Sequence, residues 1–234
     1  MILVVAHNVL QGGGVNIVSS FLDYLQSKNL FALAILPDIK IYREIAKKND
    51  KLTIIWFPSN ILRFLYKIIF LYKINNIIKN NKISKVYSLG NIAYNINCPQ
   101  VVLVQNAFST LNDSRVWNRF SFFDRIYLKL MQISIRTNLK YATHILVQTE
   151  TEKRKLSQYI SKKSNISIVP NFLDTIKLGK LNKNKNVKFN GSCLKLLFLS
   201  KYYPHKNFEI LDNVCQIIVE NNLPITITLT LDNI

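Results

Sequence analysis

Acidic residues are scarce in this sequence. Its 234 residues include 13 Asp and Glu against 31 Lys and Arg, which gives a formal net charge of +18. No acidic residue stands between Asp50 and Asp113. Such an excess favours partners that carry phosphate: nucleic acid, an anionic membrane surface or a nucleotide substrate. Asn, Ile and Lys are abundant together, so drift in an AT-rich coding sequence is a second explanation of the charge.

Cysteine and histidine are also few. Cys98, Cys193 and Cys215 are odd in number and lack the C-x-x-C spacing of a metal or redox motif. We expect buried thiols in a reducing cytoplasm. No two histidines have metal-ligand spacing, so no metal site is predicted. His7 and His205 follow predicted strands, and either could reach a cleft at the strand ends.

Long hydrophobic runs are absent. No apolar run reaches the ~18 residues of a membrane-spanning helix, because Arg63, Lys67 and Lys73 interrupt the best candidate. The chain opens on an apolar segment at 1–5 without a basic region or cleavage site before it, so we expect no signal peptide. These features predict a cytoplasmic protein, which could bind peripherally at the inner face of the cell membrane.

Apolar segments of strand length alternate with helical periodicity along most of the chain. We expect strands at 2–6, 31–36, 52–57, 84–88, 101–105, 144–148 and 166–169, and helices at 15–28, 41–48, 60–80, within 116–141 and at 150–160. This alternation predicts an α/β protein with a Rossmann-like, doubly wound, mainly parallel sheet.

The segment 174–192 differs in composition. Five lysines are interleaved there with Asn and Gly, and little apolar periodicity remains, as is typical of a linker. A new β-α-β pattern follows at 194–200, 206–221 and 225–231. We therefore expect an N-terminal domain over 1–170, a linker over 171–193 and the start of a second domain over 194–234. That second domain should be incomplete, because one β-α-β unit cannot enclose a core.

Three glycines, Gly12, Gly13 and Gly14, stand between the first strand and the first helix. They permit close backbone approach, and a helix N-terminus offers N–H groups to a diphosphate or an acceptor oxygen. The spacing is not G-x-G-x-x-G, which argues against a nicotinamide dinucleotide. A tight turn that needs glycine only for its dihedral angles is the alternative.

Amides and lysines follow other predicted strands. Gln105 and Asn106 should reach the same sheet edge as the glycines, where amides can bind sugar hydroxyls or a carbonyl; a strand-end cap is the alternative. Lys201 and Lys206 stand between a strand and a helix, where an anion is favoured, although lysines there are commonly just solvated.

The segment after the strand at 144–148 predicts a capping box. Thr149 would cap the next helix with Glu152 three residues later. Glu150 would also stand at the strand end, where a catalytic role is conceivable.

The helix expected at 60–80 combines basic and aromatic residues. On a helical wheel, one face carries Arg63, Tyr66, Lys67, Phe70 and Lys73, and the opposite, core-facing side carries Ile61, Phe64, Leu65, Ile68 and Tyr72. The basic face suits an anionic bilayer or nucleic-acid phosphate, and it could equally be a solvated surface. No nucleic-acid recognition motif accompanies the charge, so nucleic acid is not the expected partner.

Four motifs, in order, resemble the retaining GT-B glycosyltransferases of family 4. They are the glycine loop 12–14, Val-Gln-Asn-Ala at 104–107, Ile-Val-Pro-Asn at 168–171 and the segment 197–207. The resemblance implies two Rossmann-like domains and a nucleoside diphosphate sugar as substrate. It implies transfer to a polysaccharide or lipid-linked acceptor in cell-surface glycan synthesis, with no metal or cofactor required.

The resemblance also implies roles for individual residues. In that family an arginine and a lysine grip the donor diphosphate, and by position these correspond to Lys201 and Lys206. Lysine at 201 keeps the charge but loses the bidentate geometry. The glycine loop and Asn106 would help to shape the acceptor side.

The family's glu-x7-glu motif has no counterpart before Ile234. We therefore expect a C-terminally truncated enzyme with a deficient donor site, or one half that a separate C-terminal half completes. The alternative is a non-catalytic membrane- or acceptor-binding module.

Overall fold

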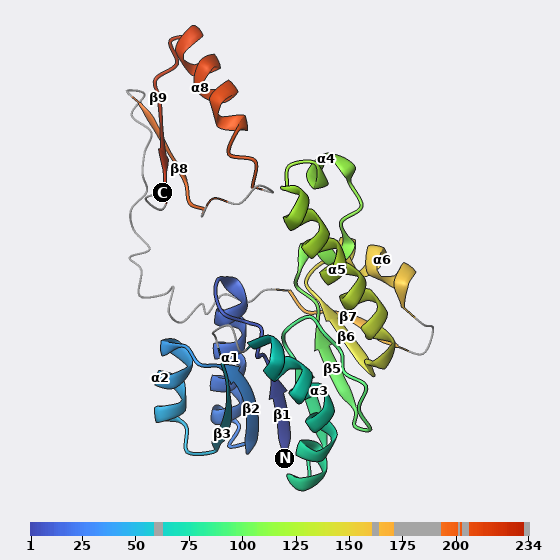
Figure 1. The fold of residues 1–234 in the computed structure, drawn as a ribbon. Helices are drawn as coiled ribbons and strands as arrows, with labels where there is room; N and C mark the ends of the chain where they lie inside the picture. Colours follow the sequence, from blue (N-terminus) through green and yellow to red (C-terminus); the bar gives the residue numbers. More distant parts are fainter. Residues whose placement is uncertain (59–62, 161–163, 171–192, 201, 203–205, 232–234) are drawn as a thin grey trace. The chain divides into compact units, whose positions relative to one another are not determined.

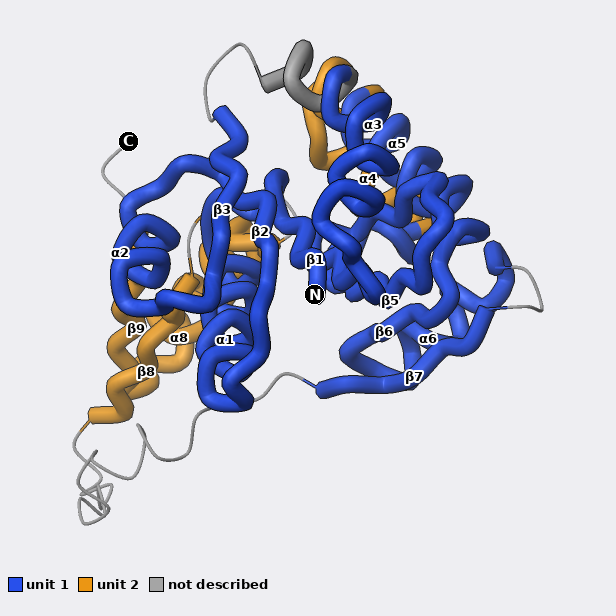
Figure 2. The backbone as a smooth tube through the Cα atoms, turned by 90° about the horizontal axis from the view of Figure 1, so that it is seen from below, with its two compact units in different colours: residues 1–111, 127–171 blue, residues 112–126, 172–234 orange. Residues whose placement is uncertain are grey.

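The computed structural model describes residues 1–58, 63–160, 164–170, 193–200, 202 and 206–231 (Figure 1). These residues form two compact units, shown in Figure 2: unit 1 is 1–111 with 127–171, and unit 2 is 112–126 with 172–234. The linker expected at 171–193 lies almost wholly outside the described residues. The domain boundaries at 170 and 194 stay predictions.

Unit 1 is built on a seven-stranded sheet with the order β3-β2-β1-β4-β5-β6-β7, in which every neighbouring pair is parallel. The strands are β1 (Ile2–Val5), β2 (Ala32–Pro37), β3 (Leu52–Phe57), β4 (Lys85–Ser88), β5 (Gln100–Leu103), β6 (His144–Val147) and β7 (Asn165–Ile168). The predicted Rossmann-like, doubly wound α/β fold is therefore confirmed.

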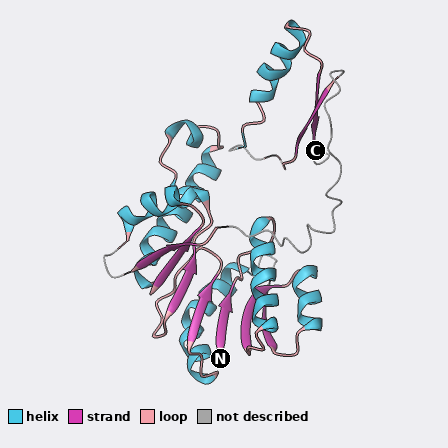
Figure 3. Ribbon diagram, turned by 180° about the vertical axis from the view of Figure 1, so that it is seen from behind, coloured by secondary structure: helices cyan, strands magenta, loops and turns pink. Residues whose placement is uncertain are grey.

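Helices cover both faces of this sheet (Figure 3). They are α1 (Gly13–Ser27), α2 (Lys40–Lys48), α3 (Arg63–Asn80), α5 (Phe122–Asn138) and α6 (Glu150–Leu156), with short 3-10 turns η1 (Ala107–Thr110), η2 (Leu139–Tyr141) and η3 (Ser157–Tyr159). Helix α1 buries Val15, Val18 and Leu22 in one cluster with Val4 of β1. On the other face, α3 packs in a cluster with Leu3 and Val5, and α5 packs over β5 and β6.

The central strands are apolar on both sides because helices cover both sides. All six residues of β2 are buried, and β1 buries three of its four. Continuous apolar strands of this kind are typical of a parallel sheet between two helical layers. The edge strand β3 instead alternates between half-buried and exposed residues over most of its length.

The orientation predicted for helix α3 is wrong. Phe70, expected on the basic face, is buried together with Ile74 and Ile78, whereas Tyr72, expected toward the core, is 82% exposed. The spacing i, i+4, i+8 of the three buried side chains defines the true core-facing stripe. Lys73 is exposed as predicted, and the side chains of Arg63 and Lys67 lie outside the described residues.

The long helix expected within 116–141 is present as α5, and the short helix α4 (Ser114–Trp117) precedes it. Helix α5 begins just after Ser121, whose hydroxyl oxygen accepts a hydrogen bond from the Asp124 N–H at 3.2 Å. A serine in that position caps a new helix and thereby favours a break in the chain before it.

Unit 2 also contains a parallel pair, β8 (Leu194–Phe198) and β9 (Ile225–Leu229), with helix α8 (Ile210–Glu220) between them in sequence. No residue of α8 is buried, and four of the five residues of β8 are exposed. Phe208 is buried, with its ring edge-on to Phe198 at 4.9 Å between centroids. Among the described residues of 193–231, Phe208 alone is buried, and the incompleteness of a second domain stays a prediction.

Among the described helices, none combines the length and the apolar character required to span a bilayer.

Candidate ligand site at the carboxyl edge of the sheet

The strand order of unit 1 reverses between β1 and β4. From β1 the chain continues through β2 and β3 on one side, and from β4 through β5, β6 and β7 on the other. In open parallel sheets, ligands bind outside the carboxyl ends of the strands at such a switch point. The loops after β1, β4 and β5 meet there, and they contain Gly12, Gly13, Gly14 and Asn106 of the sequence prediction.

The three glycines of the loop differ in backbone conformation and in what an added Cβ atom would meet. Gly12 caps α1 with φ of +71°, a left-handed conformation that disfavours other residues. A Cβ on Gly14 would lie 2.9 Å from Val9 Cγ1 and 3.2 Å from Gln105 Nε2, so this glycine permits close packing. A Cβ on Gly13 would meet nothing within 4 Å, and its φ is not positive. Neither packing nor backbone conformation requires glycine at position 13.

The loop after β4 is tied to the loop after β5 through Asn91. Its side-chain oxygen accepts hydrogen bonds from the N–H groups of Gln105 at 2.7 Å and Asn106 at 3.0 Å. Asn91 has φ of +68°, which asparagine tolerates better than most residues. One side chain therefore sets the position of the backbone that carries both predicted amides.

The loop after β1 is tied to the loop after β4 through Asn8. Its amide donates to the Gly90 carbonyl at 2.6 Å. A Cβ on Gly90 would lie 1.8 Å from the Asn8 side-chain oxygen, so any other residue there would displace the Asn8 amide. Sequence reasoning missed Asn8, Gly90 and Asn91; the one signal was the Gly90-Asn91 pair directly after an apolar strand.

Gln105 and Asn106 lie at this edge, and both are half-buried. Gln105 donates to the Leu89 carbonyl at 3.4 Å. The side-chain oxygen of Asn106 accepts from the Phe108 N–H at 2.9 Å and caps η1, while its amide nitrogen lies 3.7 Å from Met131 Sδ. The strand-end cap considered for this asparagine is therefore present, and a role toward an acceptor stays a prediction.

The expectation that His7 could reach a cleft is wrong. Its side chain is 2% exposed and stacks on Phe57, with 4.6 Å between ring centroids. Its Nε2 lies 3.1 Å from the Tyr94 hydroxyl oxygen, and burial raises the pKa of that hydroxyl above its ordinary value of 10.0. His7 is thus part of the core beneath the edge, and His205 lies outside the described residues.

The predicted capping box at the start of α6 is confirmed. Thr149 Oγ1 accepts from the Glu152 N–H, and the Glu152 carboxylate accepts from the Thr149 N–H, both at 3.1 Å. Glu152 is thereby committed to the helix start. Glu150 is exposed in the first turn of the same helix.

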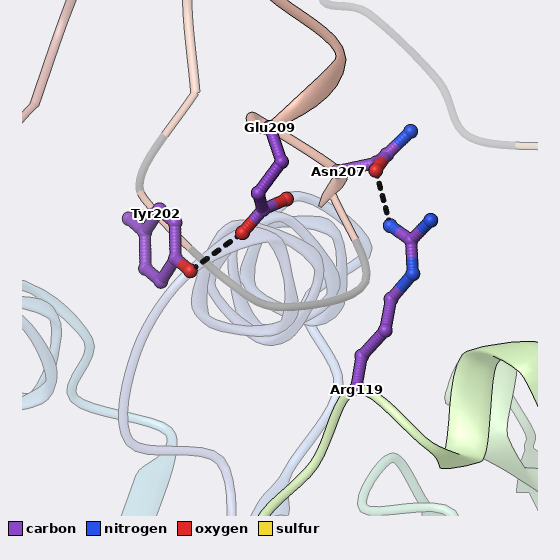
Figure 4. Close-up of a pocket in the computed structure, with 4 residues that line it drawn as sticks. All are labelled: Arg119, Tyr202, Asn207 and Glu209. Atoms are coloured by element: carbon purple, nitrogen blue, oxygen red, sulfur yellow. Dashed lines mark hydrogen bonds between the residues drawn. The ribbon is translucent and has the colours of Figure 1, made fainter. Parts of the chain in front are cut away.

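The two lysines predicted to bind the donor diphosphate, Lys201 and Lys206, belong to unit 2. Lys206 is exposed and stands four residues before α8, while Lys201 lies outside the described residues. A polar pocket of about 360 Å³ in this unit is lined by Arg119, Tyr202, Asn207 and Glu209 (Figure 4). Asn207, one of the lining residues, directly follows Lys206 in the sequence.

Hydrogen bonds order the lining of this pocket (Figure 4). The Tyr202 hydroxyl donates to Glu209 Oε1 at 2.8 Å, and Arg119 donates to Asn207 Oδ1. A hydrogen bond from the backbone of Glu209, followed by that from Tyr202, lowers the pKa of the Glu209 carboxyl. The carboxylate is therefore ionised at neutral pH, next to the guanidinium of Arg119.

Comparisons of the sequence return no match, either among protein-family models or among curated proteins. Comparisons of the structure do return matches. The chain is similar to Anabaena HepE, solved with UDP and glucose, with a TM-score of 0.57 and 12% identity over 97% of this chain and 60% of that one. It is also similar to a glycosyltransferase from Rickettsia africae, with a TM-score of 0.50 and 15% identity over 98% and 68% of the two chains. An Escherichia coli trehalose-6-phosphate structure bound to UDP-2-fluoro glucose matches with a TM-score of 0.51 and 10% identity, over 98% and 64%.

At such low identity these likenesses establish the fold alone. That fold is the Rossmann-like α/β architecture expected from the resemblance to GT-B glycosyltransferases, and this expectation is confirmed. The chain spans about 60% of the length of HepE. Membership of family 4 stays a prediction.

Proposed function

We propose that the protein is a glycosyltransferase that takes a sugar from a nucleoside diphosphate sugar. The observation that carries the proposal is the glycine loop at the β1/β4 switch point, in a fold shared with structures that contain UDP or a UDP-sugar. The acceptor would be a polysaccharide or a lipid-linked glycan. The reaction would take place at the inner face of the cell membrane.

The acceptor side is assigned to the carboxyl edge of unit 1. Three loops there hold each other through Asn8 and Asn91, so their polar groups are fixed before a ligand arrives. Pre-organised groups bind at a lower entropic cost than groups that must first be ordered. The open space at Gly13 leaves room for a sugar hydroxyl beside the first turn of α1.

The donor side is assigned to Lys206, with Lys201 as its partner by position. Transfer of a sugar leaves a nucleoside diphosphate that carries new negative charge on its departing oxygen. Lysine ammonium groups and N–H groups at a helix N-terminus stabilise such charge. This scheme requires no metal ion.

Titration calorimetry with UDP and UDP-glucose tests the donor assignment. We expect Lys206→Ala to weaken binding about tenfold, since a charge-assisted phosphate contact contributes about 1.5–3 kcal/mol when well formed and less when solvated. Lys195→Ala is the matched control, because Lys195 is an exposed lysine of β8 in the same unit. Equal affinities for both variants would contradict the role of Lys206.

A non-catalytic binding module is the second candidate. The exposed large apolar side chains of α3 and of the unit 1 part of α5 favour it, because exposed apolar groups suit a binding surface. In that case the protein would bind membrane or glycan without a saturable response to any nucleotide sugar.

A further inference from the structure

The polar pocket of unit 2 combines side chains of opposite charge. Its described lining residues, Arg119, Tyr202, Asn207 and Glu209, all belong to that unit (Figure 4). Its volume of about 360 Å³ is at the lower end of the range of ligand pockets, so it suits a small metabolite or one part of a nucleotide. None of the four side chains is needed for the role proposed for Lys206.

Three aromatic rings hold the loop before α8 against β8. The ring of Phe208, a residue that is 7% exposed, lies 4.9 Å from that of Phe198 and 5.5 Å from that of Tyr202, between centroids. Asn207 and Glu209 flank this buried phenylalanine in the sequence. Because Phe208 is anchored, both polar neighbours are held at the pocket together with Tyr202.

Arg119 reaches the pocket from the end of α4. Trp117 is buried two residues earlier, and the Arg119 N–H donates to the Val116 carbonyl at 3.2 Å, so the backbone is fixed at this point. A guanidinium group has five N–H donors. Among the described residues it has one hydrogen-bond partner, the side-chain oxygen of Asn207. The other donors can therefore bind two oxygens of one phosphate group.

Glu209 contributes the opposite charge. Its Oε1 accepts a hydrogen bond from the Tyr202 hydroxyl at 2.8 Å, and the residue is exposed. A carboxylate has about four lone-pair sites, so this one can also accept hydrogen bonds from the hydroxyls of a sugar. A phosphate without hydroxyls would only be repelled by it. The mixed lining therefore favours a ligand that carries both phosphate and hydroxyl groups.

The hydrogen bonds of the pocket are better explained by binding than by stability. Arg119, Tyr202 and Glu209 are all exposed, and contacts of charged groups at the surface contribute little to folding. The same contacts hold the guanidinium and the carboxylate in place before a ligand arrives. Such pre-organisation lowers the entropic cost of binding.

We propose that the unit 2 pocket binds a phosphorylated sugar, with the phosphate on the Arg119 guanidinium and a sugar hydroxyl on the Glu209 carboxylate. Exposed Lys206 directly precedes Asn207, so two positive charges outnumber the one carboxylate and a phosphate is favoured. The ligand is either the ribose and diphosphate of a nucleotide sugar or a free sugar phosphate. The first source rests on the function proposed above and extends its donor site beyond the lysines; the second source does not.

Titration calorimetry of the full chain with UDP, glucose 1-phosphate and pyrophosphate tests the pocket. We expect Arg119→Gln to weaken the binding of the phosphorylated sugar about tenfold, because a two-point contact with phosphate is lost. Arg115→Gln is the matched control. Arg115 is an exposed arginine of α4 that pairs with Asp113 and does not line the pocket. Its loss removes the same charge from the same segment and should leave the affinity unchanged.

Glu209→Gln separates the pocket from a general attraction between charges. Glutamine keeps the size of the side chain and can still accept from Tyr202, but it has no negative charge. Pyrophosphate should bind this variant more tightly than it binds the wild type, which a folding defect cannot produce. The preference for the phosphorylated sugar over pyrophosphate should fall about fivefold, because the contact between carboxylate and hydroxyl is lost.

The outcomes distinguish the pocket from the donor assignment. If Arg119→Gln binds every ligand like the wild type while Lys206→Ala weakens UDP binding, the pocket proposal is wrong and the donor assignment stands. If glucose 1-phosphate binds through Arg119 and UDP does not bind, the pocket takes a free sugar phosphate and the donor assignment is wrong. An equal loss of affinity in Arg115→Gln, or no binding of any of the three ligands by the wild type, would also overturn the pocket proposal.

Discussion

The glycine loop permits a sharp test, because its members differ in what a methyl group would meet. Gly13→Ala adds a Cβ into open space at the first position of α1, with an ordinary φ. Alanine loses less backbone entropy than glycine on entering a helix, so this variant should be more stable by about 0.5 kcal/mol. A ligand that approaches the loop closely would nevertheless meet the added methyl group.

Gly14→Ala and Gly12→Ala are the comparison variants. The Gly14 Cβ would press on Val9 and Gln105, so overpacking should cost about 1–3 kcal/mol. Gly12 has positive φ, so alanine there should cost about 1 kcal/mol although the space is open. Urea unfolding of the three variants measures these differences directly.

Function separates the two interpretations of the loop. The donor is UDP-glucose and the acceptor is a membrane lipid extract. Gly13→Ala should raise the apparent KM for the acceptor at least about tenfold, since displacing one contact between acceptor and loop costs about 1.4 kcal/mol or more. If the more stable Gly13→Ala variant keeps wild-type kinetics, the loop is only a turn. The proposal that it binds a ligand would then be refuted.

Two further predictions concern stability. Thr149→Ala removes one half of the capping box with Glu152, so it should lower the free energy of unfolding by about 1 kcal/mol, as measured in urea. Burial raises the pKa of Tyr94 in the folded protein, whereas the unfolded value stays near 10. The folded state therefore binds the Tyr94 proton more tightly than the unfolded state does. The contribution of the protonated Tyr94 hydroxyl to folding stability is fully present below about pH 10 and is lost as the pH rises further. Urea midpoints between pH 9 and pH 12 should fall for the wild type and fall less steeply for Tyr94→Phe; parallel curves would show that Tyr94 does not contribute.

The sheet was predictable because each central strand is a continuous apolar segment that can be recognised in the sequence by itself. The segments that became β1 and β2 are wholly apolar, which a parallel sheet between two helical layers requires. The orientation of α3 was not predictable from residues 61–73 alone. Apolar side chains occur on every side of that helix, and the stripe that packs on the sheet is fixed by Phe70 together with Ile74 and Ile78.

The candidate site was only partly predictable for a related reason. The glycine loop and Asn106 are visible as local motifs after strands. The bonds that organise the edge join residues far apart in sequence: Asn8 and Gly90 are 82 positions apart, and Asn91 and Gln105 are 14 apart. Such pairs depend on which strands become neighbours, and the sequence pattern does not specify that order.

The most direct test of the proposed function is transfer itself. The full protein is incubated with membrane lipid extract and a panel of UDP- and GDP-sugars that carry a labelled sugar. We expect at least one donor to release its nucleoside diphosphate in equal amount to the label that appears in lipid or glycan, slowly and at high donor concentration, because the sequence predicts a deficient donor site. If no donor binds or turns over while the protein binds membrane vesicles, the protein is a binding module and the proposed glycosyltransferase activity is wrong.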